Sequence, residues 1–208
     1  MKRKEVCVID YGMGNLGSLK NALKYLNTKV TITNKHEVIL KSKILFLPGV
    51  GSFKKAMNEI KIRKLDKVIH ETIKKGHYIF GICLGMQLLG TSSNEDGVTK
   101  GLGVVNNKIF KFSDKETKNK KIPHVGFNSV KFEKSNKLFR GLESNSDFYF
   151  VHSYRMLPEK LKNNISITKY GVNFLSSFNQ ENVFATQFHP EKSQGNGLKV
   201  LENFISLT

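Results

Sequence analysis

The sequence has no tryptophan, only two cysteines and only four prolines in 208 residues. Two cysteines cannot build a disulfide framework, and no cysteine or histidine pair has the spacing of a zinc site, so we expect no metal. No segment approaches the roughly 18 consecutive apolar residues that a membrane span requires. The basic N-terminus runs into a strand-like segment without a signal-peptide cleavage pattern. We therefore expect a soluble, cytoplasmic protein that does not associate with a membrane.

Acidic residues are also scarce, because 17 Asp and Glu stand against 34 Lys and Arg, which gives a net charge of +17. Such an excess attracts phosphate backbones. The lysines are nevertheless spread over the whole chain. The densest run, Lys115 to Lys121, contains Glu116 and no aromatic residues that could stack on bases. We expect a solvated basic surface and no nucleic-acid partner.

Short apolar segments alternate with helical patterns in the first half, which predicts βαβ units and a mainly parallel sheet. The predicted strands there are 6–10, 29–33, 43–48 and 77–82, and the predicted helices are 15–26, about 53–75 and 84 onward. The second half predicts strands at 101–105, 108–112, 125–132, 147–154, 165–170, 173–178 and 182–188, before a final helix at 197–207. No repeat or linker divides the chain, so we expect a single domain over residues 1–208.

The pentapeptide Gly81 to Gly85 places Cys83 between two glycines, where a predicted strand meets a predicted helix. This Gly-x-Cys-x-Gly corner is a cysteine version of the nucleophile elbow, whose cramped backbone leaves no room for side chains at the glycines. A helix that begins just after Cys83 would stabilise the thiolate, the reactive form of the thiol. A buried cysteine in a tight turn is the alternative interpretation of these five residues.

A base for this nucleophile is found in the segment FHPEKS, residues 188–193. His189 could take the thiol proton and later protonate a leaving nitrogen, and Glu191 could hold the other ring nitrogen. His152 is the competing candidate for the base, but no carboxylate follows it. We expect the other histidines to be surface or structural residues.

A literal match to the dinucleotide-binding pattern G-x-G-x-x-G spans residues 12–17. The match is weak, because Asn34 rather than an acid ends the second predicted strand and Asp10 would lie close to the pyrophosphate. We expect no cofactor.

With these motifs the sequence resembles the class I (triad) glutamine amidotransferases, and among them the glutaminase subunits of imidazole glycerol phosphate synthases. The resemblance covers essentially the whole chain, through DYGMGNLGSLKNAL, LPGVGSF, GICLGMQLL, GLGVV, PHVGFN, YFVHSY and QFHPEKS. It implies an α/β fold of the flavodoxin-like three-layer type. In that fold helices flank a mainly parallel central sheet, and additional antiparallel strands follow in the second half.

The resemblance also implies a role for individual residues. Cys83 would be the nucleophile, His189 the general base and then acid, and Glu191 its orienting carboxylate. The oxyanion hole would be formed by backbone around Gly49, Val50, Gly51 and Leu84, after reorientation of the Gly49–Gly51 turn. The implied substrate-binding residues are Gln87, Glu95, His152, Ser153 and Tyr154. The implied partner-facing residues are Asn15, Phe127, Tyr149 and Lys192.

The implied reaction is hydrolysis of glutamine to glutamate and ammonia through a cysteine thioester. The ammonia would pass to a (β/α)₈-barrel cyclase subunit, the partner in a heterodimer, which makes imidazole glycerol phosphate and aminoimidazole carboxamide ribotide in histidine biosynthesis. Phe127 stands where the family usually has tryptophan, so an aromatic wall is kept but the indole N–H is lost. This substitution leaves open a paralogous subunit that feeds ammonia to a sugar-modifying enzyme of surface-polysaccharide biosynthesis.

Two alternatives from other classes also stay open at this point. The elbow alone would fit a stand-alone cysteine hydrolase or peptidase, which would turn over peptides or esters without a partner. The charge of +17 would fit a basic binding module on a degenerate amidotransferase scaffold. Such a module would bind nucleic acid in a salt-sensitive way and would have no reactive thiolate.

Overall fold

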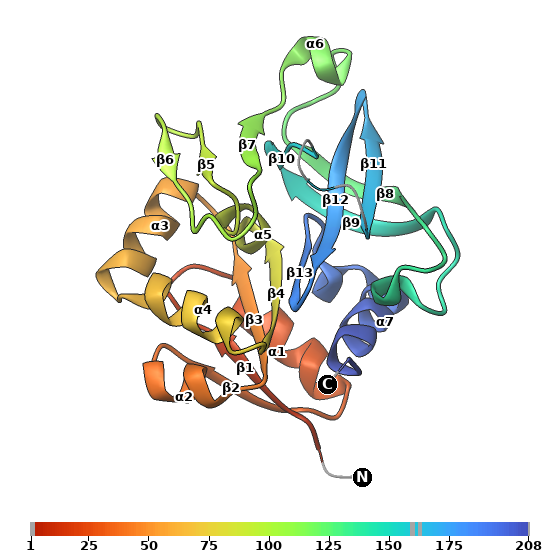
Figure 1. Cartoon of the computed structure of the whole chain (residues 1–208). Coiled ribbons are helices and arrows are strands. Elements are labelled where there is room, and N and C mark those ends of the chain that lie inside the picture. Colours follow the sequence, from red (N-terminus) through yellow and green to blue (C-terminus); the bar gives the residue numbers. More distant parts are fainter. Residues whose placement is uncertain (1–2, 159–160, 162–163, 208) are drawn as a thin grey trace.

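The computed structural model describes residues 3–158, 161 and 164–207. Its main feature is a nine-stranded sheet with the strand order β2-β1-β3-β4-β13-β12-β11-β8-β9 (Figure 1). From β2 to β13 neighbouring strands are parallel, and from β13 to β9 they are antiparallel. The order β2-β1-β3-β4, continued by a fifth parallel strand, is that of flavodoxin-like doubly wound folds. The predicted α/β class is therefore confirmed.

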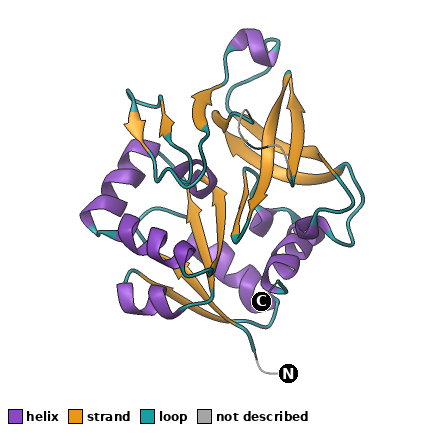
Figure 2. Cartoon of the chain, in the orientation of Figure 1, coloured by secondary structure: helices purple, strands orange, loops and turns teal. Residues whose placement is uncertain are grey.

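The parallel strands are β1 (Glu5–Ile9), β2 (Lys29–Thr33), β3 (Ile44–Gly49), β4 (Tyr78–Cys83) and β13 (Val183–Thr186). The antiparallel strands are β8 (His124–Phe132), β9 (Ser146–His152), β11 (Ile165–Tyr170) and β12 (Val172–Gln180). A second, four-stranded sheet contains β5 (Ser92–Ser93), β6 (Thr99–Lys100), β7 (Lys108–Lys111) and β10 (Tyr154–Met156). Figure 2 shows helices beside the parallel strands, whereas the antiparallel strands extend away from them.

Helices cover both faces of the parallel strands. One face carries α2 (His36–Lys41), α3 (Phe53–Ile62) and α4 (Leu65–Lys74), and the other carries α1 (Leu16–Tyr25) and α7 (Gln194–Ile205). The remaining helices are α5 (Leu84–Leu88), α6 (Asp114–Thr117), and the 3₁₀ turns η1 (Lys137–Phe139) and η2 (Pro190–Lys192). None of the helices in the described part of the chain has the length and apolar character that crossing a bilayer demands.

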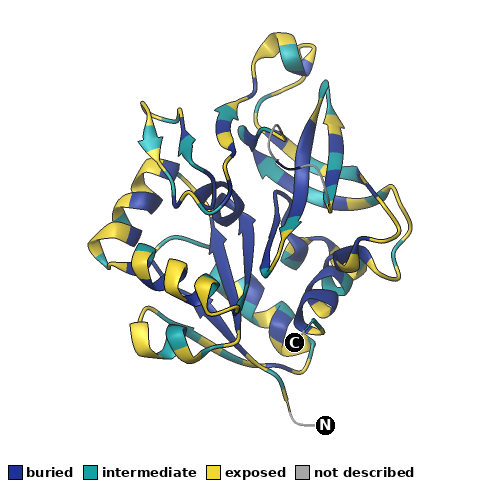
Figure 3. Ribbon diagram, in the orientation of Figure 1, coloured by how far each residue is buried: buried dark blue, intermediate teal, exposed yellow. Residues whose placement is uncertain are grey.

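The strand periodicity of two separates the cores on the two faces of the sheet. Along β1, Cys7 and Ile9 belong to the core under α2, α3 and α4, whereas Val6 and Val8 belong to the core under α1 and α7. In Figure 3 the central strands are buried along their length, and the outer sides of α3 and α4 are exposed. This burial on both faces explains the nearly continuous apolar run in β3.

Three sequence-based expectations differ from the structure. The single strand expected over 147–154 is divided at Ser153 into β9 and β10, which belong to different sheets. The helical pattern over 53–75 is two helices, because Lys64 adopts a left-handed conformation (φ 55°) and breaks the hydrogen-bonding ladder. The prediction of a strand at 101–105 is wrong. The N–H groups of Leu102 and Val105 donate at 2.8 and 3.0 Å to the carbonyls of Leu88 and Leu89, which close α5. The segment therefore caps a helix end instead of joining a ladder.

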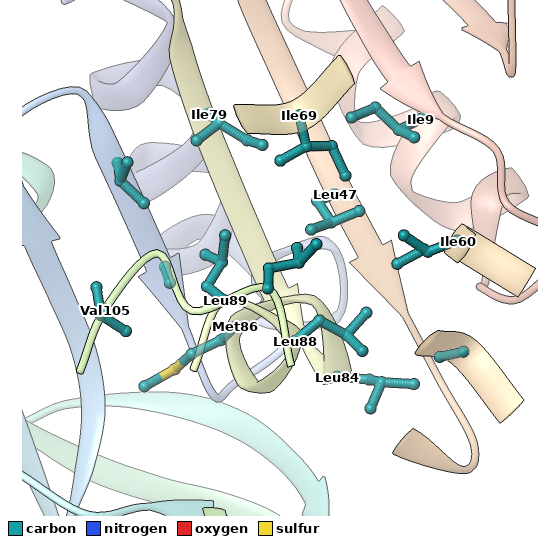
Figure 4. Close-up of a cluster of buried hydrophobic side chains, with 14 of the residues drawn as sticks. Ile9, Leu47, Ile60, Ile69, Ile79, Leu84, Met86, Leu88, Leu89 and Val105 are labelled. Carbon is teal, nitrogen blue, oxygen red and sulfur yellow. The ribbon is translucent and has the colours of Figure 1, made fainter. Parts of the chain in front are cut away.

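The short helix α5 is anchored in the core that lies under α3 and α4 (Figure 4). Leu84 and Leu88 of α5, and Leu89 at its end, pack among side chains from β3, β4, α3 and α4, including Leu47 and Ile60. These side chains are at most 3% exposed. The corner between β4 and α5 is therefore held rigidly at the carboxyl ends of the parallel strands, where ligands bind in open α/β sheets.

Candidate active site

Cys83 forms the corner between β4 and α5 in a strained conformation. Its φ of 53° and ψ of −107° lie outside the regions that residues with a Cβ normally occupy. Such strain costs on the order of 1–3 kcal/mol and persists only where the surrounding structure imposes it. Because α5 has only five residues, its dipole is smaller than the sequence pattern suggested. Other groups must therefore contribute to stabilising a thiolate.

The glycines around Cys83 are required by close backbone packing. A Cβ on Gly85 would collide with the carbonyl oxygen of Leu47 in β3, and a Cβ on Gly81 would meet the backbone of Gly85 at 3.0 Å. Residues with side chains at these two positions would push α5 away from the sheet. The Gly-x-Cys-x-Gly spacing thus follows from the geometry of the corner.

His189 lies just after β13, which pairs in parallel with β4, so both strands end at the same edge of the sheet. The Nδ1 atom of His189 lies 2.8 Å from Oε1 of Glu191. The two side chains are only 2% and 4% exposed. The His189 backbone is also fixed, because its N–H donates to the Tyr149 carbonyl and its carbonyl accepts from the Ser193 hydroxyl.

Burial of the His189 ring would lower its pKa, but the charge of Cys83 and the hydrogen bond to Glu191 outweigh this and raise the pKa to about 10. Nε2 of His189 is buried and has no geometrically satisfactory hydrogen bond among the described residues. The Cys83 thiol instead points toward the Val151 carbonyl at 3.9 Å. The raised pKa favours a protonated His189 ring beside Cys83, and Nε2 is the nitrogen that carries the transferable proton.

A cavity of about 440 Å³ opens beside Cys83. It is lined by many of the residues that the sequence singled out: Val50, Gly51, Cys83, Leu84, Gln87, Glu95, His152, Ser153 and Tyr154. Gly49 lies just behind this wall, because a Cβ there would collide with the Tyr11 hydroxyl and approach Cβ of Leu84 at 3.0 Å. The structure thus brings the predicted nucleophile, oxyanion and substrate-binding residues to one place. No three His, Cys, Asp or Glu side chains gather as a metal site within the described ranges.

Two of the lining residues are already hydrogen-bonded to the protein. Gln87 uses its side-chain nitrogen for the Tyr154 carbonyl at 2.9 Å and for Oε1 of Gln187 at 3.0 Å, which leaves its oxygen as the group free for a ligand. Oε2 of Glu95 accepts from the backbone N–H of Phe53 at 2.7 Å, at the start of α3. Burial, followed by the charges of Glu95 and Asp96, raises the pKa of Tyr154.

His152, the competing candidate for the base, is held neutral. Its Nδ1 lies 2.8 Å from the Tyr154 carbonyl, and its Nε2 lies 3.2 Å from Nδ1 of His124. Burial is the main cause that lowers its pKa to about 3. Both ring nitrogens are therefore engaged, and His189 is the histidine that the geometry favours as base.

Three of the four predicted partner-facing residues lie together outside the cavity. Phe127 is 50% exposed, and its ring centroid lies 5.6 Å from that of Tyr149. Nζ of Lys192 lies 5.8 Å from the Tyr149 ring. We call Phe127, Tyr149 and Lys192 the aromatic patch. Asn15 lies apart from these contacts in sequence and caps α1 through a hydrogen bond from the Ser18 N–H.

Sequence reasoning missed four residues at the site. Pro123 and Val151 line the cavity, and Tyr11 donates its hydroxyl to the Pro48 carbonyl at 2.8 Å, beside the Gly49–Gly51 turn. Gln187 donates to Sγ of Cys83 at 3.6 Å. The only available signal for Gln187 was its position at the end of the same strand that leads to the histidine.

Comparisons with known proteins identify the family. The family model for the class I glutamine amidotransferases matches residues 7–207. The chain therefore belongs to the class I glutamine amidotransferases.

Within that family, the similar relatives share one name. The chain is 46% identical to imidazole glycerol phosphate synthase subunit HisH 2 of Methanococcus maripaludis, over 96% of this chain and 98% of the relative. It is 46% identical to subunit HisH of Methanocaldococcus jannaschii, over 96% and 98%. It is 44% identical to subunit HisH of Aquifex aeolicus, over 95% and 94%.

Solved structures support the fold alone, because their sequence identities are low. PurLQS from Thermotoga maritima has a TM-score of 0.73 at 17% identity, with 99% of each chain covered. A glutamine amidotransferase from the same organism has a TM-score of 0.65 at 16% identity, covering 100% of this chain and 83% of that chain.

Proposed function

We propose that this chain is the glutaminase subunit of an imidazole glycerol phosphate synthase, and that Cys83, His189 and Glu191 hydrolyse glutamine. The observation that carries the proposal is the buried His189 ring, whose Nδ1 lies 2.8 Å from Oε1 of Glu191 and whose pKa is raised, despite burial, by the charge of Cys83. Cys83 itself forms a strained corner and lines the cavity, in a chain of the amidotransferase family.

In the proposed reaction, Cys83 attacks the side-chain amide carbon of glutamine as its thiolate. His189, protonated by the thiol, donates its proton to the leaving nitrogen, and ammonia departs. Water then loses a proton to His189 and attacks the thioester, which releases glutamate. The oxyanion of each tetrahedral intermediate accepts from the Leu84 N–H and from an N–H of the Gly49–Gly51 turn. One such donor is typically worth a factor of about 100–1,000 in rate.

The cavity offers complementary groups for the amino-acid end of glutamine. The Glu95 carboxylate suits the α-ammonium, and the oxygen of Gln87 is the group left to accept a hydrogen bond from the substrate. Backbone N–H groups of the segment from His152 to Tyr154 suit the α-carboxylate. His152 would contribute its backbone to this segment and not a ring charge, because burial keeps its ring neutral.

We propose further that the aromatic patch and Asn15 face a (β/α)₈-barrel cyclase subunit, which receives the ammonia in a heterodimer. A half-exposed aromatic residue such as Phe127 is a typical interface anchor. The expectations that residues 1–208 form one domain and that the protein is cytoplasmic stay predictions.

The glutaminase proposal is tested by measuring glutamate release from glutamine by the chain mixed with its barrel partner and the partner's ligand. Cys83→Ala should abolish release, because no other group at the site can form the thioester. Cys7→Ala is the matched control, because it removes the other thiol, which is buried in β1. Full activity of Cys83→Ala would refute the mechanism.

The partner proposal is tested by titrating the chain with the histidine-pathway barrel subunit. Phe127→Ala should weaken binding by about 30-fold, the effect of losing about 2 kcal/mol at a central aromatic anchor. Ile62→Ala is the control, because Ile62 is 73% exposed on the distant end of α3. Binding and activation by a sugar-modifying acceptor instead of the cyclase would favour the paralogous function.

A further inference from the structure

Gln187 is a buried polar residue beside the nucleophile that the reaction described above does not use. It directly follows β13, and its backbone N–H donates to the Ser176 carbonyl at 2.8 Å. Its side chain is fully buried, with Nε2 at 3.6 Å from Sγ of Cys83. Because buried amides need partners for their polar atoms, the contact with sulfur is part of how this side chain is satisfied.

A chain of hydrogen bonds determines which end of the Gln187 amide faces the sulfur. The Tyr154 carbonyl can only accept, so the Gln87 side chain must turn its nitrogen toward it. The same nitrogen faces Gln187 at 3.0 Å, and the atom that it meets must therefore be the acceptor Oε1. The amide nitrogen of Gln187 is then left to donate to Cys83.

This donor favours the charged form of the nucleophile. An N–H group binds a thiolate more strongly than a thiol, because the bond gains from the negative charge. The Val151 carbonyl, 3.9 Å from the sulfur, has the opposite preference, because it can only accept a hydrogen bond, which the neutral thiol donates and the thiolate cannot. Gln187 thus favours the thiolate form of Cys83, whereas Val151 favours its thiol form.

The titratable groups that interact with Cys83 follow β13 and β1. His189 follows β13 and interacts with the sulfur, and Glu191 acts on that ring through its hydrogen bond. Tyr11 follows β1, and burial together with the charge of Cys83 raises its pKa, so its hydroxyl stays protonated. Gln187 differs from these groups because it is a donor at every pH.

We propose that Gln187 is a further catalytic residue, whose side-chain N–H stabilises the Cys83 thiolate. The inference rests on the proposed glutaminase function. The donor acts before attack and again in hydrolysis of the thioester. There water attacks the carbonyl carbon and passes a proton to His189, the carbon–sulfur bond breaks, and its electron pair returns to the sulfur beside Gln187.

The test is the pH dependence of alkylation of Cys83 by iodoacetamide, in a Cys7→Ala background that leaves one thiol. It needs neither glutamine nor the partner. Gln187→Leu should raise the midpoint of the profile by about one pH unit, which corresponds to an about 10-fold smaller thiolate fraction at pH values below the midpoint. The midpoint is a better measure than the rate, because a more basic thiolate is also more nucleophilic.

Two further variants make the outcome decisive. Gln187→Met keeps the length of the side chain and removes the donor, so it should shift the midpoint upward by a similar amount, even where Gln187→Leu does not fold. Gln180→Leu makes the same substitution at an exposed position of β12 and should leave the midpoint unchanged.

An unchanged midpoint in folded Gln187→Leu or Gln187→Met, with a reactive parent protein, would overturn the role of Gln187 and leave the glutaminase proposal intact. Absence of alkylation of Cys83 in the parent at any pH would contradict the glutaminase proposal itself.

Discussion

Substitution of Cys83 by glycine and by alanine separates the backbone strain at the corner from its chemistry. Both variants lose the sulfur, so their difference reports only on the Cβ and the backbone. At φ 53° and ψ −107°, glycine is unstrained whereas alanine keeps a strain on the order of 1–3 kcal/mol. Alanine regains about 0.4–1 kcal/mol through the lower entropy of its unfolded chain, and up to about 0.8 kcal/mol through burial of its methyl group.

With the strain and entropy terms at the middle of their ranges and the full burial term, Cys83→Gly should be more stable than Cys83→Ala by about 0.5 kcal/mol. Ala185 of β13 is the matched control, because it is fully buried one strand away from the corner. There the same two gains favour alanine, so Ala185→Gly should destabilise by about 1–2 kcal/mol.

The contrast between the two positions isolates the strain, because the entropy and burial terms largely cancel. We expect a contrast of about 2 kcal/mol. The assay is equilibrium urea unfolding of the isolated chain, with midpoints converted to free energies at a common slope. A contrast close to zero, with alanine favoured equally at both positions, would refute the claim that Cys83 is strained.

Two other predictions concern packing and pH. Gly85→Ala should destabilise the protein by at least the roughly 1–3 kcal/mol typical of overpacking, because its Cβ meets the Leu47 carbonyl. The control Gly17→Ala in α1 has open space and should stabilise the protein by about 0.5–1 kcal/mol in the same unfolding assay. Burial, then the charge of Lys120, lowers the pKa of His124 to about 4, so only the unfolded chain binds this proton between pH 6.5 and pH 4. As the pH is lowered from 6.5 to 4, the free energy of unfolding should fall by an amount on the order of 3 kcal/mol. His124→Gln should remove this loss, whereas the control His36→Gln on the surface should not. An equal pH slope in the parent and in His124→Gln would contradict the assignment.

The sequence predicted most reliably those features that depend on local backbone geometry. The α/β class followed from alternating strand and helix patterns, and the corner at Cys83 followed from two glycines that leave no room for a Cβ. The helix break at Lys64 was not predictable, because a left-handed lysine has no sequence signature comparable to glycine. The strand expected at 101–105 failed because its N–H groups are taken by the end of α5, a contact that only the tertiary structure creates.

The same limit explains which site residues were missed. The neighbouring residues in the sequence predict the roles of Cys83 and His189. The proposed role of Gln187 depends instead on Gln87 and the Tyr154 carbonyl, which orient its amide from other parts of the chain. His124 was expected to be a surface or structural residue, and it is a buried partner of His152 behind the cavity wall. Polar networks of this kind depend on side-chain contacts between elements, which periodicity and spacing do not encode.

The contacts around the Gly49–Gly51 turn also limit how the oxyanion hole can form. On one side, the Tyr11 hydroxyl holds the Pro48 carbonyl at 2.8 Å and fills the space beside Gly49. On the other side, Glu95 holds the N–H of Phe53 at the start of α3. The reorientation that the family resemblance implies is then confined to the peptide units around Val50 and Gly51, where Val50 is 39% exposed and Gly51 has φ 101°. Since Glu95 also lines the cavity, a ligand that draws its carboxylate away from Phe53 would remove this hydrogen bond at the start of α3, next to the turn.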